Sequence, residues 1–196
     1  MPVVAGEFKG EESMEAKQTP GARIKRWTKR LEEKPDSAIA YFNLGLAYTD
    51  VAKMTSAEKA YRQAVEVDPG LVQAWVNLAG VLLMQWRFEE SLEAGRMAVQ
   101  LDSGLPLVHF NMGQAHLYLG DSESLVECTR KVLELEPDHP AANYFLAVGL
   151  LAEKNTKEAR FYMDRATRLG HRPTPEFLRA MDRAATDGVQ LIEIGK

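Results

Sequence analysis

The side chains in this sequence that are best suited to chemistry are two histidines and one cysteine. His109 and His116 stand seven residues apart and would share one face of a helix, a spacing that could suggest a metal site. Both fall on packing positions of the repeat described below, which favours a role in the core or at a groove edge. Cys128 has no histidine near it in the sequence and is expected to be a structural thiol.

No phosphate-binding loop, dinucleotide-binding fingerprint, zinc-protease helix or EF-hand loop occurs in the chain. The sequence therefore predicts no catalytic residue, no metal ligand and no cofactor. We expect the protein not to be an enzyme.

A second set of polar side chains recurs along the chain at a fixed distance. Asn43, Asn77 and Asn111 are evenly spaced in the sequence. An amide side chain both donates and accepts hydrogen bonds, so such a ladder could hold the backbone of an extended peptide without reading its sequence. The alternative is that each asparagine bonds only to a neighbouring helix or to water.

Composition limits the class of protein. The 196 residues suit one domain, and 45% of them are hydrophobic, as in an ordinary globular protein. The formal net charge of -4 argues against a nucleic-acid partner, which requires a basic surface. One cysteine cannot form an internal disulfide, and no apolar stretch is long enough to span a membrane. The first residues do not resemble a secretory signal, so a cytoplasmic location is expected.

The element that must position the asparagines is an internal repeat. A pattern of small, apolar, polar, apolar, acidic and proline residues returns every 34 positions, at 64–69, 98–103 and 132–137, with weaker copies at 30–35 and 166–171. The interval is the same as that between the asparagines. The fixed step defines four repeats, at 38–71, 72–105, 106–139 and 140–173. Two short helices cannot bury their apolar faces alone, so each repeat must stack on the next.

This pattern resembles the tetratricopeptide repeat (TPR) family, whose unit is a helix–turn–helix of this length. The first repeat carries the family's residue types at every packing position: Tyr41, Leu44, Gly45, Tyr48, Ala57, Tyr61 and Ala64. The third repeat departs most from the pattern, at Leu125, Thr129 and Val132. The resemblance implies an all-α, right-handed α-solenoid of helix–turn–helix repeats with a capping helix at each end.

The sequence outside the repeats supplies the two expected caps. Residues 21–36 are predicted to form an N-terminal capping helix around Trp27, and residues 174–186 a C-terminal one. Residues 1–20 lack periodicity and are expected to be disordered. Residues 187–196 alternate apolar and polar like a strand, which favours a disordered or loosely docked tail, with pairing to another copy as the alternative.

In the TPR family the first helix of each repeat lines a concave face that binds partner proteins. The positions that lie on that face are mostly apolar or aromatic in this chain, which predicts an apolar groove. The predicted groove residues, besides the three asparagines, are Phe42, Leu46, Val76, Leu83, Phe110, Gln114, Tyr118 and Tyr144. The alternative is that some of these side chains belong to the core, or that the chain's own ends cover them.

The resemblance also indicates the kind of partner. Family members that bind an acidic C-terminus use a clamp of cationic residues, and here apolar or amide residues such as Ile39, Phe42, Leu107 and Asn111 occupy such places. We therefore expect an apolar protein or peptide segment as the partner, not an acidic C-terminus, a nucleic acid or a membrane. The predicted function is an adaptor or scaffold. The alternatives are a chaperone-like assembly factor for a client subunit and a scaffold that self-assembles through its stack ends or C-terminal tail.

Overall fold

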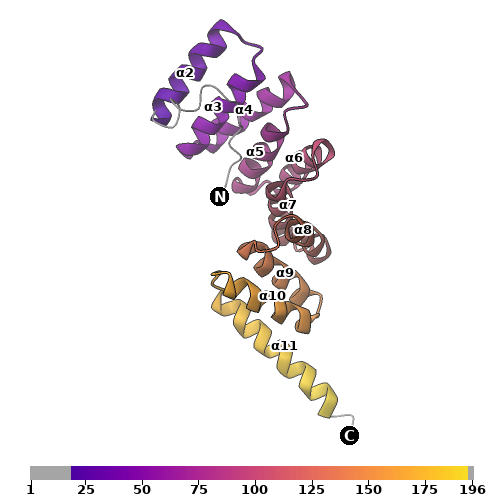
Figure 1. The fold of residues 1–196 in the computed structure, drawn as a ribbon. Helices are drawn as coiled ribbons and strands as arrows, with labels where there is room; N and C mark the ends of the chain where they lie inside the picture. The colour runs from indigo at the N-terminus through magenta and orange to yellow at the C-terminus, as the bar shows by residue number, and fades with distance from the viewer. Residues whose placement is uncertain (1–18, 194–196) are drawn as a thin grey trace. The chain divides into compact units, whose positions relative to one another are not determined.

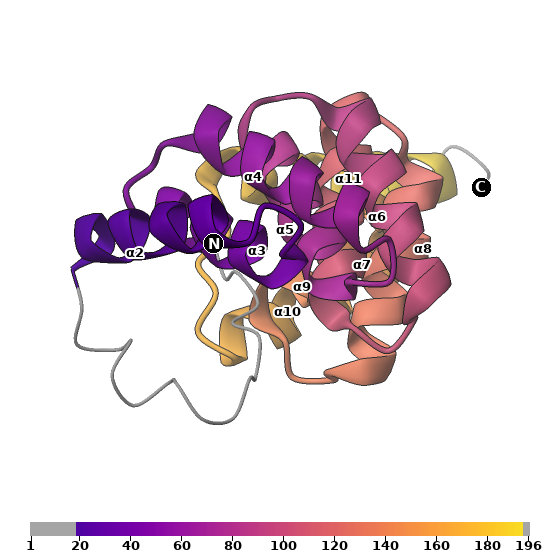
Figure 2. The same cartoon turned by 90° about the horizontal axis from the view of Figure 1, so that it is seen from above.

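The computed structural model describes residues 19–193, with side chains described to residue 184. The stretch 1–20, expected to be disordered, thus lies almost entirely outside the described residues. Every element within the described range is an α-helix, as the TPR resemblance predicts (Figures 1 and 2). The helices are α2 (Pro20–Glu33), α3 (Ala38–Asp50), α4 (Met54–Val67), α5 (Val72–Met84), α6 (Phe88–Leu101), α7 (Pro106–Leu119), α8 (Ser122–Leu135), α9 (Pro140–Ala152), α10 (Thr156–Arg168) and α11 (Pro175–Glu193).

The helix boundaries repeat with the period of the sequence. The first helices of the four repeats begin at residues 38, 72, 106 and 140, and the second helices begin at 54, 88, 122 and 156. Both series advance by the same step as the sequence pattern. Equivalent positions in different repeats therefore lie at equivalent places on their helices, and this places the asparagines in one helical phase.

The turn between the two helices of each repeat uses one backbone conformation throughout. The residue at the turn has a positive φ in every repeat: 56° at Ala52, 63° at Trp86, 76° at Gly120 and 63° at Lys154. Only the third repeat has glycine there, although this region costs other residues roughly 1–2 kcal/mol. The packing of the two helices must therefore determine the turn, since local preference opposes it at three of the four sites.

The chain divides into two compact units, Met1–Asn111 and Met112–Lys196. In the first unit α2 packs on α3, α3 pairs with α4, α4 packs on α5 and α5 pairs with α6. Close approach of α3 and α4 depends on Gly45, because a Cβ added there would lie 2.4 Å from the buried ring of Tyr61. The small residue on α3 thus allows a large ring of α4 to pack directly against its backbone.

In the second unit α8 packs on α9, α9 pairs with α10, and α11 packs on both α9 and α10. Gly113 on α7 lies against α8, where a Cβ would meet Cys128 and Thr129 at ordinary contact distances of 3.4 and 3.5 Å. Phe177 and Met181 from α11 join the core of the last repeat. The last repeat is therefore followed by a helix that packs on it.

The C-terminal tail differs from its prediction. The sequence indicated a capping helix that ends at 186 and a strand-like tail, whereas α11 continues to Glu193. A short alternation of apolar and polar residues specifies a strand only where a partner strand is available. Once α11 has formed its first turns, each added residue extends it at little cost until a breaker intervenes, and no proline follows Pro175.

Candidate functional site

The three asparagines occupy the same repeat position on α3, α5 and α7, all within the first unit. Asn43 is half-buried, and its amide donates a hydrogen bond of 2.9 Å to the carbonyl oxygen of Ile39 on the same helix. Asn77 and Asn111 are only 3% and 5% exposed. Asparagine is seldom buried to this extent, because a buried amide requires neighbouring groups that satisfy its polar atoms.

A glycine on α5 allows Asn111 to approach its neighbouring helix. A Cβ added at Gly80 would lie 3.4 Å from the amide nitrogen of Asn111. Gly80 is a predicted groove-face position of the second repeat, and Asn111 is one of the third. The wall formed by successive first helices is therefore continuous between α5 and the start of α7.

The apolar residues of the predicted groove in the first unit fall into two groups. Leu46 and Phe110 are half-buried, whereas Val76 and Leu83 are buried. Phe42 is fully buried in the core of the first repeat, with its ring centroid 6.0 Å from that of Tyr61. Phe42 thus contributes to the packing of α3 against α4, which is the role that the alternative interpretation gave to some of these residues.

The remaining predicted groove residues belong to the second unit. Gln114 is buried and Tyr118 is 55% exposed. Tyr144 lies in the core of this unit, where its ring centroid is 5.2 Å from that of Phe177 and 4.4 Å from that of His171. Tyr144 therefore packs against α11, the helix at the C-terminal end.

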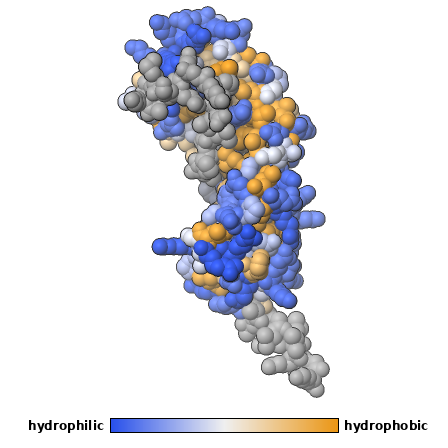
Figure 3. All heavy atoms as spheres, in the orientation of Figure 1, coloured by the Kyte–Doolittle hydropathy of each residue, from blue (hydrophilic) through white to orange (hydrophobic). Residues whose placement is uncertain are grey.

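Two exposed apolar side chains of the first unit were not among the predicted site residues. Ile39 at the start of α3 is 43% exposed, and Met84 at the end of α5 is 39% exposed. Both stand at repeat positions assigned to the concave face, so the repeat register contained the signal that would have found them. On the face drawn in Figure 3, hydrophobic side chains gather on the first unit beyond α2.

The histidines and the cysteine have local contacts. His109 Nε2 lies 2.9 Å from the carbonyl oxygen of Ser103, and His116 Nδ1 lies 3.1 Å from a carboxylate oxygen of Asp121. Burial, with nearby Glu127 and Asp121, raises the pKa of the Cys128 thiol to about 11, which makes it a poor nucleophile at neutral pH. No group of three or more metal-ligating side chains that could hold an ion was found among the described residues.

An ion-pair network joins the first two repeats. The carboxylate of Glu58 on α4 accepts hydrogen bonds from Arg62, Arg87 and Gln85. Burial opposes ionisation of Glu58, but these hydrogen bonds outweigh it and hold its pKa below the usual value. The network is a structural link between α4 and the turn that precedes α6.

Paired helices that recur at one fixed interval, with amide and apolar side chains on the first helices, define a helical-repeat scaffold. The family model for the tetratricopeptide repeat matches residues 50–106 and 110–171, more than half of the chain. The protein therefore belongs to the tetratricopeptide repeat family. None of the described helices is long and apolar enough to cross a membrane.

One curated relative is small glutamine-rich tetratricopeptide repeat-containing protein 2 of Mycosarcoma maydis. The two sequences are 30% identical over 84 residues, which is 43% of this chain and 24% of the relative. The match thus spans about a quarter of the relative's length.

Solved structures share the fold over most of the chain. A crystal structure of MamA superposes with a TM-score of 0.75 at 18% identity and covers 84% of this chain and 96% of its own. YrrB, described as a TPR protein with an unusual peptide-binding site, gives a TM-score of 0.71 at 20% identity, with 88% and 86% of the two chains covered. PilF of Pseudomonas aeruginosa gives 0.71 at 25% identity, with 92% and 86% covered.

Proposed function

We propose that the protein is an adaptor that binds a segment of another protein along the first helices of its repeats. The observation that carries the proposal is the placement of Asn43, Asn77 and Asn111 at one repeat position on α3, α5 and α7. Asn43 is half-buried, and Asn77 and Asn111 are 3% and 5% exposed, so a bound backbone would reach these two amides only at their remaining exposed edge. A peptide backbone presents alternating donors and acceptors, which a row of amides can match.

Apolar side chains beside the ladder would supply most of the binding free energy. Ile39 and Met84 are exposed large hydrophobic residues, and Leu46 and Phe110 are half-buried. Each large side chain removed from water on binding contributes roughly 1.5–3 kcal/mol. A few such contacts give micromolar affinity after the cost of ordering the peptide.

The apolar side chains of the groove also indicate that the central part of the bound segment is apolar. Ile39 and Leu107 stand at places where clamp-type family members carry cations. A terminal carboxylate buried there would lose its hydration without gaining a positive partner. YrrB, a relative in fold, is described as having a peptide-binding site, and this supports a peptide ligand for the present chain.

Selection of binders from a random-peptide phage library on the immobilised protein provides a probe, and fluorescence polarisation of the selected peptide measures its affinity. We expect Asn77→Ala combined with Phe110→Ala to weaken binding at least tenfold, which is about 1.4 kcal/mol. Because Asn77 is buried, circular dichroism and thermal denaturation must show that the double variant keeps its helices and folds at the assay temperature.

A matched control changes amides on the second helices. Gln63 on α4 and Gln100 on α6 are both exposed. The double variant Gln63→Ala with Gln100→Ala should bind the selected peptide as tightly as the unaltered protein. Equal affinity of the control and the Asn77/Phe110 variant would overturn the groove assignment.

A further inference from the structure

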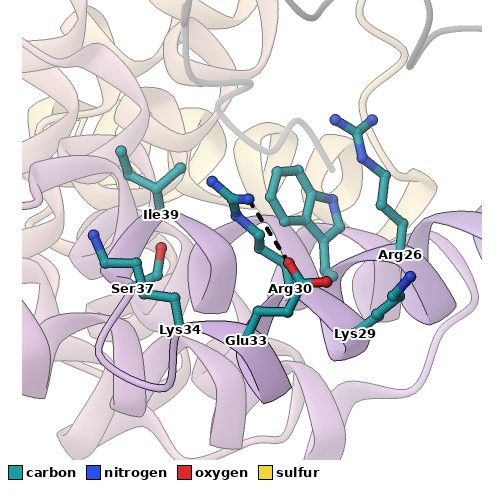
Figure 4. A pocket seen from close by; sticks show the side chains of 8 residues that line it. Arg26, Lys29, Arg30, Glu33, Lys34, Ser37 and Ile39 are labelled. Carbon is teal, nitrogen blue, oxygen red and sulfur yellow. Dashed lines mark ion pairs between the residues drawn. The ribbon is translucent and has the colours of Figure 1, made fainter.

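The end of the first unit carries an open pocket of about 440 Å³ between α2 and the start of α3 (Figure 4). Four cationic side chains of α2 and the residue that follows it line the pocket: Arg26, Lys29, Arg30 and Lys34. Glu33 is the one carboxylate among the lining residues, so the lining carries a formal charge of +3. In Figure 3 the surface at the α2 end is hydrophilic.

The repeat register explains why this pocket is open. Trp27 stands one repeat before Tyr61 and shares a buried cluster with Ala40 and Leu44 of α3. Arg26 and Arg30 stand one repeat before Ala60 and Ala64, which are 5% and 0% exposed. Among the described residues no helix precedes α2, and arginines stand where the first two repeats hold buried alanines.

The sign of the charge also departs from the repeat. Lys34 corresponds in register to Asp68 and Asp102, the acidic residues of the six-residue pattern. A capping helix requires only a polar outer face, which either sign of charge would provide. The departures at residues 26, 30 and 34 instead all add positive charge on one side of α2.

The pocket reinforces this charge with a helix terminus. Ser37, the N-cap of the 13-residue α3, lines the pocket, and the first turn of α3 contains no acidic residue. The backbone N–H groups at such a terminus favour a nearby anion. The carboxylate within the pocket neutralises little of the field, since Glu33 lies 3.9 Å from Arg30 and both side chains are more than half exposed.

We propose that this pocket binds acidic side chains of the partner's peptide segment. This inference rests on the proposed function and adds to it: the segment carries glutamate or aspartate next to its apolar part. Ile39 joins the two surfaces, because it lines the pocket and is an exposed residue at a repeat position of the proposed groove. Arginine guanidinium groups pair with carboxylates through two parallel hydrogen bonds, which gives the pocket a geometric preference for them.

A peptide fits this pocket better than a larger polyanion. The cationic lining comes from one helix and one turn, whereas the whole chain has a net charge of -4. A nucleic acid or an anionic membrane would extend past the pocket along a chain that is acidic on average. A few carboxylates on one segment can be accommodated within about 440 Å³.

Fluorescein-labelled hexaglutamate is the probe for this site, with hexaglutamine as the uncharged counterpart. We expect saturable binding of hexaglutamate only, weakened when ionic strength rises from about 0.05 M to about 0.3 M. Arg26→Gln with Arg30→Gln should raise the dissociation constant at least tenfold. The control, Lys53→Gln with Lys59→Gln, removes the same charge from exposed positions beside and on α4 and should change it less than twofold.

Three outcomes would overturn the proposal. The first is that hexaglutamate shows no saturable binding, and the second is that the two double variants lose affinity equally. The third is that Arg26 and Arg30 are needed for binding of phosphatidylserine vesicles or oligothymidylate but not for binding of hexaglutamate. The groove is tested separately. Asn77→Ala with Phe110→Ala should leave hexaglutamate binding intact, so failure of the groove and failure of this pocket give different results.

Discussion

The two terminal helices both cover an end of the repeat series, but their surfaces differ. The N-terminal α2 has one buried side chain, Trp27, which packs on α3. The C-terminal α11 contributes two, Phe177 and Met181, which join the core around Tyr144. Each helix covers an end of the repeat series that would otherwise expose apolar surface.

The outer surfaces of these helices differ in charge. From residue 20 to residue 34 the chain has six cationic and two acidic side chains. From residue 175 to residue 184 it has two of each, and Arg179 pairs with Glu176 at 2.8 Å while Asp182 pairs with Arg160 at 3.7 Å. The C-terminal cap thus carries no positive excess, which separates the positive charge on α2 from its packing role.

Removing the buried ring from each cap is the change with the largest expected effect. Trp27→Ala should cost about 3–5 kcal/mol of local stability and loosen α2, because only the half-buried Ile24 and Leu31 of this helix would still pack on the cluster. Phe177→Ala should cost a similar amount, but Met181, 1% exposed, should keep α11 docked. Hydrogen exchange measured by mass spectrometry would show loss of protection throughout α2 in the first variant and only partial loss in α11 in the second.

Leu178→Ala provides the control for this comparison, since Leu178 is 40% exposed on the same helix as Phe177. Its exchange pattern should match that of the unaltered protein. If Trp27→Ala left the protection of α2 unchanged, Trp27 would not be the side chain that holds α2 in place as a cap.

The sequence predicted the helical repeat well, since packing and periodicity both determine it. The starts of all eight repeat helices follow from the constant step, whereas the contact of Gly45 with the ring of Tyr61 was found only in the structure. The sequence could not separate groove from core for Phe42 and Tyr144, because both surfaces are apolar and adjacent on one helix. Their ring contacts with Tyr61 and Phe177 became evident only in three dimensions.

The charged pocket on α2 was missed for a different reason. Lysine and arginine on a terminal helix are ordinary in a sequence, and their significance depends on which face they share. The repeat register already aligned Arg30 with the buried Ala64, and that mismatch was the available signal.

Substituting alanine for the glycine in each terminal helix tests the stability of the helix itself. Gly188 lies inside α11, whereas Gly21 lies in the first turn of α2, next to Pro20. Gly188→Ala should stabilise α11 by about 1 kcal/mol, because glycine in a helix interior costs that amount relative to alanine. Gly21→Ala should have a smaller effect, since a first-turn residue is less constrained. Far-UV circular dichroism and hydrogen exchange would detect the gain, and a loss of helicity in Gly188→Ala would contradict the continuation of α11 to Glu193.

The smallest expected difference between the two caps is in how their stability depends on pH. Burial lowers the pKa of His171, whose ring stacks on Tyr144 beneath α11, below the ordinary value of 6.5, whereas α2 contains no histidine. The unfolded chain therefore binds a proton at this site at a higher pH than the folded chain does. The contribution of the neutral ring to stability is complete above the pKa of the unfolded chain and declines as pH falls from that pKa towards the lower pKa of the folded chain.

Chemical denaturation from about pH 7.5 to about pH 5.5 should show a smaller pH-dependent loss of stability in His171→Gln than in the unaltered protein, because the variant has no proton to bind there. Parallel losses in the two proteins would mean that the acid sensitivity originates elsewhere in the chain.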